Sequence, residues 1–566
     1  MPTTDRRFDV VVVGSGPAGS TAVQELTERG LEVLLLEAGR DLREEDFLPP
    51  ERKKPGAMGM DLLARARAMA AGQYVQACRP YFSEMSNRFL VNDLEEPYST
   101  PLAHPYLWIR SKMLGGRMNS YGRVLQRMSD VDFHAASRDG YGDDWPISYA
   151  DLEPWYDRVE DRLGVYGDAD GLVHPPDGHH VGPGFLTRVE QDFKEKVEAR
   201  WPERKVISWR VQAPFLDRTP PGIAAGLATG RLTVRTEAVV SRITTDPRTG
   251  LATGVVYVDR TTRREHRVFA DVVMVCASTI ESIRLLLNSG SSRHPDGLGN
   301  SSGLLGHYFM DQTISVGFFD SPKHAGQWDA ADNLPADPFY GTPGGILIPR
   351  YENLGPELAK GFLRGVSFQG LGGRFPVPEG HPAAFGLGGS GEMLARFDNT
   401  VGVHPRRTDR WGVPIPRIDV SMGENDRILL TRTMTALRQM ADEAGYRVNF
   451  IGSAAGLESA TVWPDFNPLQ RAIFKQGIKL SIVLGAAIHE CGGARMGDDP
   501  RTSVMNGANQ LWDAPNVLVP DASSFVSGST VGPALTIMAL AARAGAFVAR
   551  QHADGGLTRP AQAAAA

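Results

Sequence analysis

Residues 8–37, with the sequence FDVVVVGSGPAGSTAVQELTERGLEVLLLE, decide the fold of this chain. An apolar run at 10–13 leads into three glycines spaced G-x-G-x-x-G, and an amphipathic stretch then leads to a second apolar run at 33–36. The second run ends at an acid, Glu37. This order of strand, glycine turn, helix, strand and acid favours a dinucleotide-binding unit over a plain packing turn.

Each part of the motif has its own physical role. Gly14 permits the tight turn, Gly16 lets the main chain approach a pyrophosphate, and Gly19 lets the helix pack close to the strand. The start of the helix adds unpaired N–H groups and a partial positive charge for the phosphates. Glu37 is placed to accept hydrogen bonds from an adenosine ribose. The glycines alone do not distinguish FAD from NAD.

The composition excludes several classes of partner. The 566 residues carry 60 Lys and Arg against 66 Asp and Glu, a balance that gives no general attraction to nucleic acid or to an anionic membrane. The three cysteines, Cys78, Cys276 and Cys491, are too far apart for a metal site and too few for a disulfide scaffold. No apolar run reaches about 18 residues, and the N-terminus lacks a signal-peptide segment. We therefore expect a cytoplasmic protein without metal.

The rest of the chain alternates between strand and helix patterns. Residues 231–275 have strand-like alternation, 278–289 return to helix, and 425–444 have a helical pattern. A packing helix is expected over 148–166, with Ser148 as its cap. Residues 340–420 are rich in Gly and Pro, as in loops where substrates often enter. We expect the alanine tail from Ala561 to be disordered.

Together with later motifs, the chain resembles the glucose-methanol-choline (GMC) family of FAD-dependent oxidoreductases over nearly its whole length. Within the family, the chain is similar to a bacterial branch that includes pyranose oxidases, glycoside 3-oxidases, glucoside 3-dehydrogenases and gluconate dehydrogenases. The stretch 143–160 is similar to the same branch. The motifs that carry the resemblance are Gly14-x-Gly16-x-x-Gly19 with Glu37, Gly115-Gly116-x-x-Asn119, Ala277-Ser278-x-x-Glu281-Ser282, His489-Glu490-x-Gly492-x-x-x-Met496-Gly497, Asp521-Ala522, and Gly532-Pro533-Ala534-Leu535-Thr536.

The resemblance implies an α/β fold with a discontinuous Rossmann-like FAD-binding domain and an interleaved α+β substrate domain. The FAD-binding domain would comprise 1–300 and 481–555, with insertions at about 51–105 and 140–225. The substrate domain would comprise 301–480 and be built on a largely antiparallel sheet.

The resemblance also implies FAD as the cofactor. The residues expected to contact it are Gly14, Gly16, Gly19, Glu37, Gly115, Gly116, Asn119, Val239, Ala277, Asp521, Ala522, Gly532, Pro533 and Ala534. Some relatives attach FAD covalently through a histidine in the second glycine turn. Residues 119–122 contain no histidine, so we expect non-covalent FAD.

His489 resembles the catalytic histidine of the family. Oxidation of an alcohol by hydride transfer to flavin N5 requires a base for the hydroxyl proton, and imidazole titrates near neutral pH. The alternative is a structural, hydrogen-bonded histidine, which we favour for the other twelve histidines. The resemblance thus implies oxidation of a secondary hydroxyl of a sugar or glycoside to a keto-sugar, with oxygen or another acceptor taking the electrons.

The chain departs from the family at Gly532, where members usually have a second His or Asn that faces the first. The alternatives for that role are Ser529, Thr530, a group of the substrate, a water, or a residue from 340–420. The departure keeps open a flavin-containing lyase or isomerase, oxidation of a non-sugar alcohol, and a protein that keeps FAD without turnover. Possible substrate contacts are Gln312, Arg374, His404 and Trp411. The sequence leaves the sugar, the oxidised carbon, the acceptor and the oligomeric state open.

Overall fold

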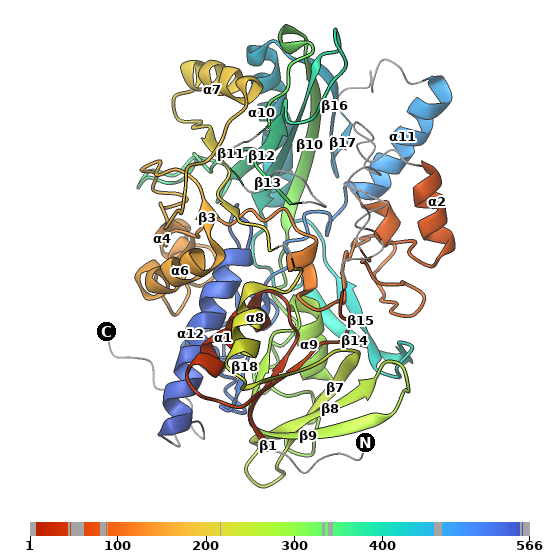
Figure 1. Ribbon diagram of the computed structural model, residues 1–566, viewed down its shortest axis with the longest axis vertical. Helices are drawn as coiled ribbons and strands as arrows, with labels where there is room; N and C mark the ends of the chain where they lie inside the picture. The colour runs from red at the N-terminus through yellow and green to blue at the C-terminus, as the bar shows by residue number, and fades with distance from the viewer. Residues whose placement is uncertain are drawn as a thin grey trace.

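The computed structural model describes residues 7–42, 46, 62–79, 87, 89–215, 217–330, 334, 336–337, 343–457, 467–554 and 557. The alanine tail and part of the 51–105 insertion lie outside these residues. Two large sheets lie one above the other along the long axis of the molecule (Figure 1).

The first sheet is built around β1 (Arg7–Val13), which pairs in parallel with β2 (Val33–Leu36) and with β9 (Glu265–Val275). Its strand order is β6-β2-β1-β9-β8-β7, with β18 beside β9. The further strands are β6 (Leu232–Arg235), β7 (Ala238–Thr245), β8 (Ala252–Asp259) and β18 (Val517–Leu518). Val10 and Val12 pack into one hydrophobic cluster and Val11 and Val13 into another, so both faces of the sheet are buried.

Three helices cover one face of this sheet: α1 (Pro17–Glu28), α8 (Pro221–Ala228) and α12 (Ala534–Ala553). The β1-α1-β2 unit forms as its pattern predicts. Gly16 is the residue before α1, and no side chain caps that end of the helix. The α6 helix (Tyr149–Leu163) begins at Ser148, whose hydroxyl accepts a hydrogen bond from the Asp151 N–H, and it packs on α12. The predicted cap and the predicted α/β fold class are thus confirmed.

The second sheet has the order β17-β16-β10-β13-β12-β11-β4, and all its neighbouring strands are antiparallel. Its strands are β4 (Ile207–Ser208), β10 (Gln312–Ser321), β11 (Ile346–Ile348), β12 (Val366–Gly372), β13 (Ala383–Glu392), β16 (Arg447–Ser453) and β17 (Gly456–Leu457). The α10 helix (Glu424–Ala444), with α7 (Arg188–Arg200) beside it, covers one face. Gly391 allows this close approach, because a Cβ there would lie 3.0 Å from Leu429 Cβ. The opposite face of the sheet is left for the functional site.

The two-part division differs in detail from the expected boundaries. Strand β4 comes from the 140–225 insertion but pairs with β11 of the second sheet. Helix α7, from the same insertion, packs against α10 and β12. Strands β14 (Thr400–Thr408) and β15 (Pro414–Asp419) form a separate hairpin that packs against α9 (Thr279–Leu287). We therefore keep the domain division as a proposal, with about 184–212 added to the substrate part.

The shorter elements complete the described chain. They are α2 (Leu62–Ala70), η3 (Gln76–Cys78), η4 (Gly116–Asn119), α4 (Asp130–Phe133), α5 (Ala135–Asp139), β3 (Val165–Tyr166), β5 (Val211–Gln212), η5 (Pro322–His324), α11 (Pro468–Ser481) and η6 (Ala522–Ser524). Within the described part of the chain, no helix has both the length and the apolar character needed to cross a membrane.

Candidate active site

A cavity of about 760 Å³ lies between the two sheets. One end is lined by the residues that follow β1 and β2, where an open α/β sheet binds its ligands. His489 and Gly532 line its wall, and β10, β12 and β13 line the other end. The site therefore joins segments from nearly the whole length of the chain.

The first glycine loop leaves one opening toward this cavity. A Cβ on Gly14, which has a φ of +95°, would lie 2.4 Å from the Cys276 carbonyl oxygen, and a Cβ on Gly19 would lie 1.8 Å from the Gly14 carbonyl oxygen. A Cβ on Gly16 meets no described atom within 4 Å. Because Gly16 lines the cavity at the uncapped start of α1, its missing side chain leaves a cradle that fits a pyrophosphate.

Glu37 is held at the same end of the cavity. It is buried, its Oε1 accepts a hydrogen bond of 2.7 Å from the Gly39 N–H, and its Oε2 accepts one of 3.1 Å from the Ser15 N–H. Burial raises the pKa of Glu37, and the hydrogen bonds from Ser15 and Gly39 act in the opposite direction. The carboxyl group is thus fixed beside the glycine loop, where an adenosine ribose would lie.

The second glycine turn closes against the first. The Gly115 N–H donates to Ser15 Oγ over 2.9 Å, and a Cβ on Gly116 would lie 3.1 Å from Gly16 Cα. Asn119 Nδ2 donates to the Leu114 carbonyl over 3.0 Å. Gly115 and Asn119 are not among the residues that line the cavity, and neither is Gly19; their predicted contact with FAD stays a prediction.

The structure gathers the other expected cofactor residues on the cavity wall. The expected residues that line it are Gly14, Gly16, Glu37, Gly116, Val239, Ala277, Asp521, Ala522, Gly532, Pro533 and Ala534. The Asp521 side chain accepts hydrogen bonds from the hydroxyls of Ser282 and Ser523, which hold it in place. The contact of each residue with FAD stays a prediction.

The imidazole of His489 is oriented by Gln312. The Gln312 Nε2 amide donates to the carbonyls of Ser529, over 2.6 Å, and Val531, over 2.9 Å. These two bonds leave Gln312 Oε1 as the group that lies 2.7 Å from His489 Nδ1. An amide oxygen only accepts hydrogen bonds, so Nδ1 carries the proton and Nε2 keeps its lone pair. Nε2 is the nitrogen that faces Gly532.

The backbone just before His489 is strained. Ile488, a β-branched residue, has a φ of +62°, a conformation that costs about 1–3 kcal/mol. Two side chains hold it there: Arg117 Nη1 donates to the Ile488 carbonyl over 3.2 Å, and Asp311 Oδ1 accepts from the His489 N–H over 3.1 Å. The strain and its two supports fix the direction in which the imidazole points.

Burial and the Arg117 guanidinium lower the pKa of His489 to about 4. Arg117 itself is paired with Glu490, with 2.9 Å between Nη1 and Oε2. Burial and the charge of Glu490 raise the pKa of Asp311, which accepts a hydrogen bond of 2.9 Å from the Tyr106 hydroxyl. His489 is therefore neutral at physiological pH, and Nε2 can accept a proton.

Gly532 leaves open space beside this nitrogen. An added Cβ would lie 3.5 Å from His489 Nε2. Ser529 and Thr530, considered from the sequence as replacements for a second polar side chain, lie outside the cavity wall. The Thr530 hydroxyl is 3.3 Å from His174 Nε2, and Ser529 Oγ accepts from the Val531 N–H. Neither hydroxyl is placed to act on a substrate.

The four substrate contacts suggested by the sequence are not on the cavity wall. Gln312 lies behind His489. Arg374 Nη2 is paired with buried Glu190 at 2.7 Å. Trp411 donates from Nε1 to the Arg260 carbonyl, and His404 lies on the hairpin strand β14. Their residue types suited a polar substrate, but in the folded chain all four lie away from the cavity wall, and Gln312, Arg374 and Trp411 contact other parts of the protein.

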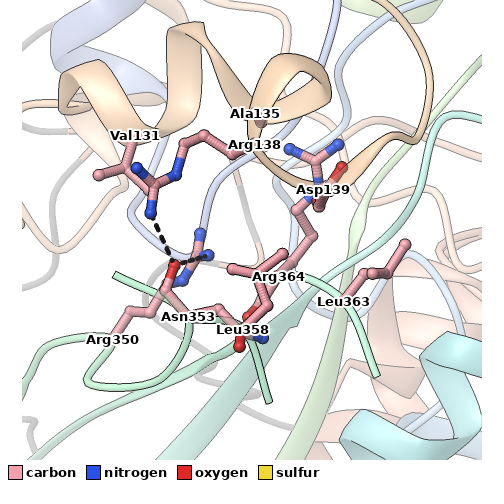
Figure 2. A pocket seen from close by; sticks show the side chains of 9 residues that line it. All are labelled: Val131, Ala135, Arg138, Asp139, Arg350, Asn353, Leu358, Leu363 and Arg364. Carbon is pink, nitrogen blue, oxygen red and sulfur yellow. Dashed lines mark hydrogen bonds and ion pairs between the residues drawn. The ribbon is translucent and has the colours of Figure 1, made fainter. Parts of the chain in front are cut away.

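A second pocket, of about 10 Å³, lies between α4, α5 and the segment 350–364 (Figure 2). Its arginines serve the protein itself: Arg138 Nη2 donates to the Leu354 carbonyl over 2.9 Å, and Arg350 Nη2 donates to the Asn353 carbonyl over 3.1 Å. Arg364 Nε pairs with Asp139 at 2.9 Å. This space holds one water at most, so it is not a candidate active site.

Sequence reasoning missed Arg117, Asp311 and Glu490 as parts of the site and assigned the wrong role to Gln312. Arg117 and Glu490 are direct neighbours of recognised motif residues, Gly116 and His489. Their adjacency to these motifs was the signal that could have identified them. No motif adjoins Asp311 or Gln312, because only the tertiary fold brings these two residues to His489.

Models of known families match this chain in three places. Two parts of the GMC oxidoreductase family match residues 225–314 and 398–541, and an NAD(P)-binding Rossmann-like domain matches residues 12–43. The chain is 29% identical to 2-methyl-1,2-propanediol dehydrogenase of Mycolicibacterium austroafricanum, with 98% of this chain and 97% of that protein covered. It is 25% identical to the fructose dehydrogenase large subunit of Gluconobacter japonicus, with coverage of 95% and 96%.

The fold has a counterpart among solved structures. The structure of a formate oxidase of Aspergillus oryzae RIB40, determined to study modification of its FAD, aligns with this chain with a TM-score of 0.66. The two chains are 15% identical, and the alignment covers 97% of this chain and 100% of the other. The glycine cradle, the lone-pair nitrogen of His489 and the two matched GMC regions agree with one another. The chain therefore belongs to the GMC oxidoreductase family, as an FAD-binding oxidoreductase that acts on CH–OH groups.

Proposed function

We propose that His489 Nε2 accepts the hydroxyl proton of an alcohol while a hydride leaves the carbon that bears this hydroxyl. Bound FAD supplies the hydride acceptor. The observation that carries this role is the Gln312 contact, which places the proton of His489 on Nδ1 and the lone pair on Nε2. The low pKa of His489 supports it, because a histidine already protonated could not act as a base.

We infer that Gly14, Gly16 and Gly116 would face the pyrophosphate of FAD, and that Glu37 would bind the adenosine ribose. The open cradle at Gly16 supports the first assignment, and the fixed carboxylate beside Ser15 supports the second. Gly532, Pro533 and Ala534 would lie beside the flavin ring.

We also propose that FAD is held without a covalent bond. His489 is the only histidine among the described residues that line the cavity. Tyr121, the tyrosine of the second glycine turn, donates its hydroxyl to Gln212. Precipitation with acid is expected to release the yellow colour into the supernatant; colour that stays with the pellet would contradict the proposal.

As the finer substrate, we propose a secondary hydroxyl of a sugar or glycoside. The similarity to the fructose dehydrogenase subunit supports this, while the similarity to 2-methyl-1,2-propanediol dehydrogenase supports a non-sugar alcohol as the second candidate. Anaerobic mixing with glycosides and diols, followed by absorbance, tests both. Bleaching of the flavin is the expected result, and peroxide release on admitting air would mark an oxidase rather than a dehydrogenase.

The open space at Gly532 is the reason to consider a lyase or isomerase of this fold, and the match to an oxidoreductase family favours oxidation over it. A lyase or isomerase predicts turnover of a bound alcohol without flavin bleaching under the same anaerobic conditions. That result would remove the oxidation proposal while leaving the cofactor assignment intact.

We further propose a cytoplasmic location, with a small-molecule substrate and oxygen or another electron acceptor as partners. The three free cysteines support a reducing compartment. Immunoblotting of separated cell fractions tests the location: recovery of the protein outside the cytoplasmic fraction would contradict it.

A further inference from the structure

The second sheet carries a slot on its cavity face, with glycine as its floor. Gly386 of β13 is paired with Phe318 of β10 on one side and with Leu371 of β12 on the other, and all three line the cavity. Neighbouring strands lie about 4.8 Å apart, so the two flanking strands are roughly 10 Å from each other. The floor lacks side chains where the walls have large apolar ones, and this shape suits a flat or slender group.

The slot continues toward the catalytic histidine. Gly388 is paired with Val316 and Gln369, and Ser390 follows it on β13. Successive rows on one strand face are about 7 Å apart, so the slot lies roughly 13–20 Å along β10 from Gln312, which binds His489. A substrate whose hydroxyl lies at His489 therefore reaches the slot only when the part that does not react is roughly 13–20 Å long.

The walls of the slot are uncharged. No charged residue of β10, β12 or β13 lines the cavity within the described ranges. Arg374, the nearest cation after β12 in sequence, is occupied by Glu190 and lies outside the wall. A carboxylate or ammonium group that entered the slot would lose its hydration and gain no opposite charge from these three strands.

We infer that the active site takes an alcohol bearing an uncharged, apolar substituent, an aryl or alkyl group, and that this substituent lies in the slot over Gly386 and Gly388. The inference rests on the alcohol oxidation proposed above. It separates alkyl and aryl glycosides, or aryl diols, from free sugars and from charged alcohols as substrates of the same site.

Two matched series test this on the FAD-loaded enzyme. One comprises methyl, 6-phenylhexyl and 6-(4-carboxyphenyl)hexyl β-D-glucopyranoside; the other comprises 1,2-propanediol, 8-phenyl-1,2-octanediol and the 4-carboxyphenyl derivative of the latter, whose phenyl groups are far enough from the hydroxyl to reach the slot. We expect kcat/KM for the phenyl member to exceed that of the methyl member roughly 10- to 100-fold. The carboxylated member is expected to fall about 100-fold below the phenyl member. Equal values for phenyl and carboxyphenyl, or a preference for methyl, would overturn the inference.

A variant that fills the floor gives the second arm. Gly386 does not have a left-handed φ, so its backbone accepts a side chain, and Gly386→Val is expected to lower kcat/KM for the phenyl member to about that of the methyl member. Gly402→Val is the matched control: Gly402 is a strand glycine of β14 outside the cavity, where an added Cβ meets no described atom within 4 Å. Equal loss for both substrates, or no change, would count against the slot.

A binding measurement separates failure of the slot from failure of the proposed oxidation. The phenyl compounds are expected to raise the Tm of wild-type protein but not that of Gly386→Val, whether or not they are oxidised. Binding of this kind without flavin bleaching would sustain the slot and remove the oxidation proposal. Bleaching by the methyl members with no gain from a phenyl group, in rate or in Tm, would do the reverse.

Discussion

The two ends of the cavity differ in charge. The end beside the first sheet is lined by many ionisable side chains, whereas β10, β12 and β13 contribute none in the described residues. At the charged end, the ions are paired within the protein: Lys112 lies 3.1 Å from Glu281, and Arg117 lies 2.9 Å from Glu490. In our proposal, phosphate recognition there would fall to main-chain N–H groups and the start of α1, and substrate recognition at the neutral end would fall to shape.

His489 lies between these ends, and its removal is expected to have the largest effect. His489→Ala deletes the only described imidazole on the cavity wall, and loss of a general base typically costs 10²- to 10⁴-fold in kcat. We expect about a 1,000-fold loss, measured by anaerobic flavin bleaching, with FAD content unchanged. A loss below about 10-fold would assign the proton transfer to another group.

Gln312→Leu is expected to reduce kcat roughly 10- to 100-fold, because Nδ1 loses the acceptor that fixes the tautomer of His489. The control is Gln312→Glu, which keeps an acceptor near Nδ1 but adds a negative charge. That charge raises the pKa of His489 and moves the acid limb of kcat/KM to higher pH. An unchanged pH profile in Gln312→Glu, despite lower activity in Gln312→Leu, would indicate a merely structural role.

Gly16→Val tests the charged end alone. The added side chain enters the open cradle at the start of α1, where we place the pyrophosphate. FAD affinity is expected to fall at least about 10-fold, as measured by equilibrium dialysis, since the main chain can no longer approach the phosphates. Gly402→Val serves again as the control. Full retention of FAD in Gly16→Val would place the cofactor elsewhere.

The sequence predicts the glycine cradle at one end of the cavity but not the slot at the other, and the reason is physical. The cradle depends on Gly14, Gly16 and Gly19, which are neighbours in the chain, so their spacing alone predicts the local geometry. The slot depends on Phe318, Leu371 and Gly386, which meet only through antiparallel pairing.

Strand pairing of this kind fixes which side chains share a face, and a shift of one residue exchanges the faces. Gln312 shows the consequence. It was recognised as a candidate contact, but its role behind His489 follows from the position of β10 relative to the 529–531 loop. His489 itself was identified from its motif, while the tautomer that makes it a base required the tertiary structure.

The pH profile tests how the charged end affects the reaction. Below its pKa the histidine is protonated and cannot act as a base, so activity is lost as pH falls through that pKa. With the pKa of His489 lowered to about 4, wild-type kcat/KM is expected to persist at pH 5, where an ordinary histidine would be charged. An acid limb near 6.5 would contradict this.

The double variant Arg117→Met/Glu490→Gln removes the cation that lowers this pKa without leaving Glu490 as an unpaired charge. Its acid limb is expected to lie at higher pH than in wild type. Arg117→Lys keeps the positive charge and is expected to keep the wild-type limb. If both variants share the wild-type limb, burial rather than Arg117 controls the histidine.

Gly532→Ala is expected to have the smallest effect, because it tests a space rather than a contact. An added Cβ would lie at an ordinary van der Waals distance of 3.5 Å from His489 Nε2, and the φ of Gly532 is not left-handed, so the backbone tolerates alanine. If Nε2 accepts the proton unaided, the added methyl group takes no part in the reaction, and kcat/KM for the oxidised substrate changes less than about 3-fold. A much larger loss, with FAD content unchanged, would mean that part of the substrate or a catalytic water occupies the space at Gly532. The missing side chain would then be a means of admitting that group, and the neutral end of the cavity would extend to the catalytic nitrogen.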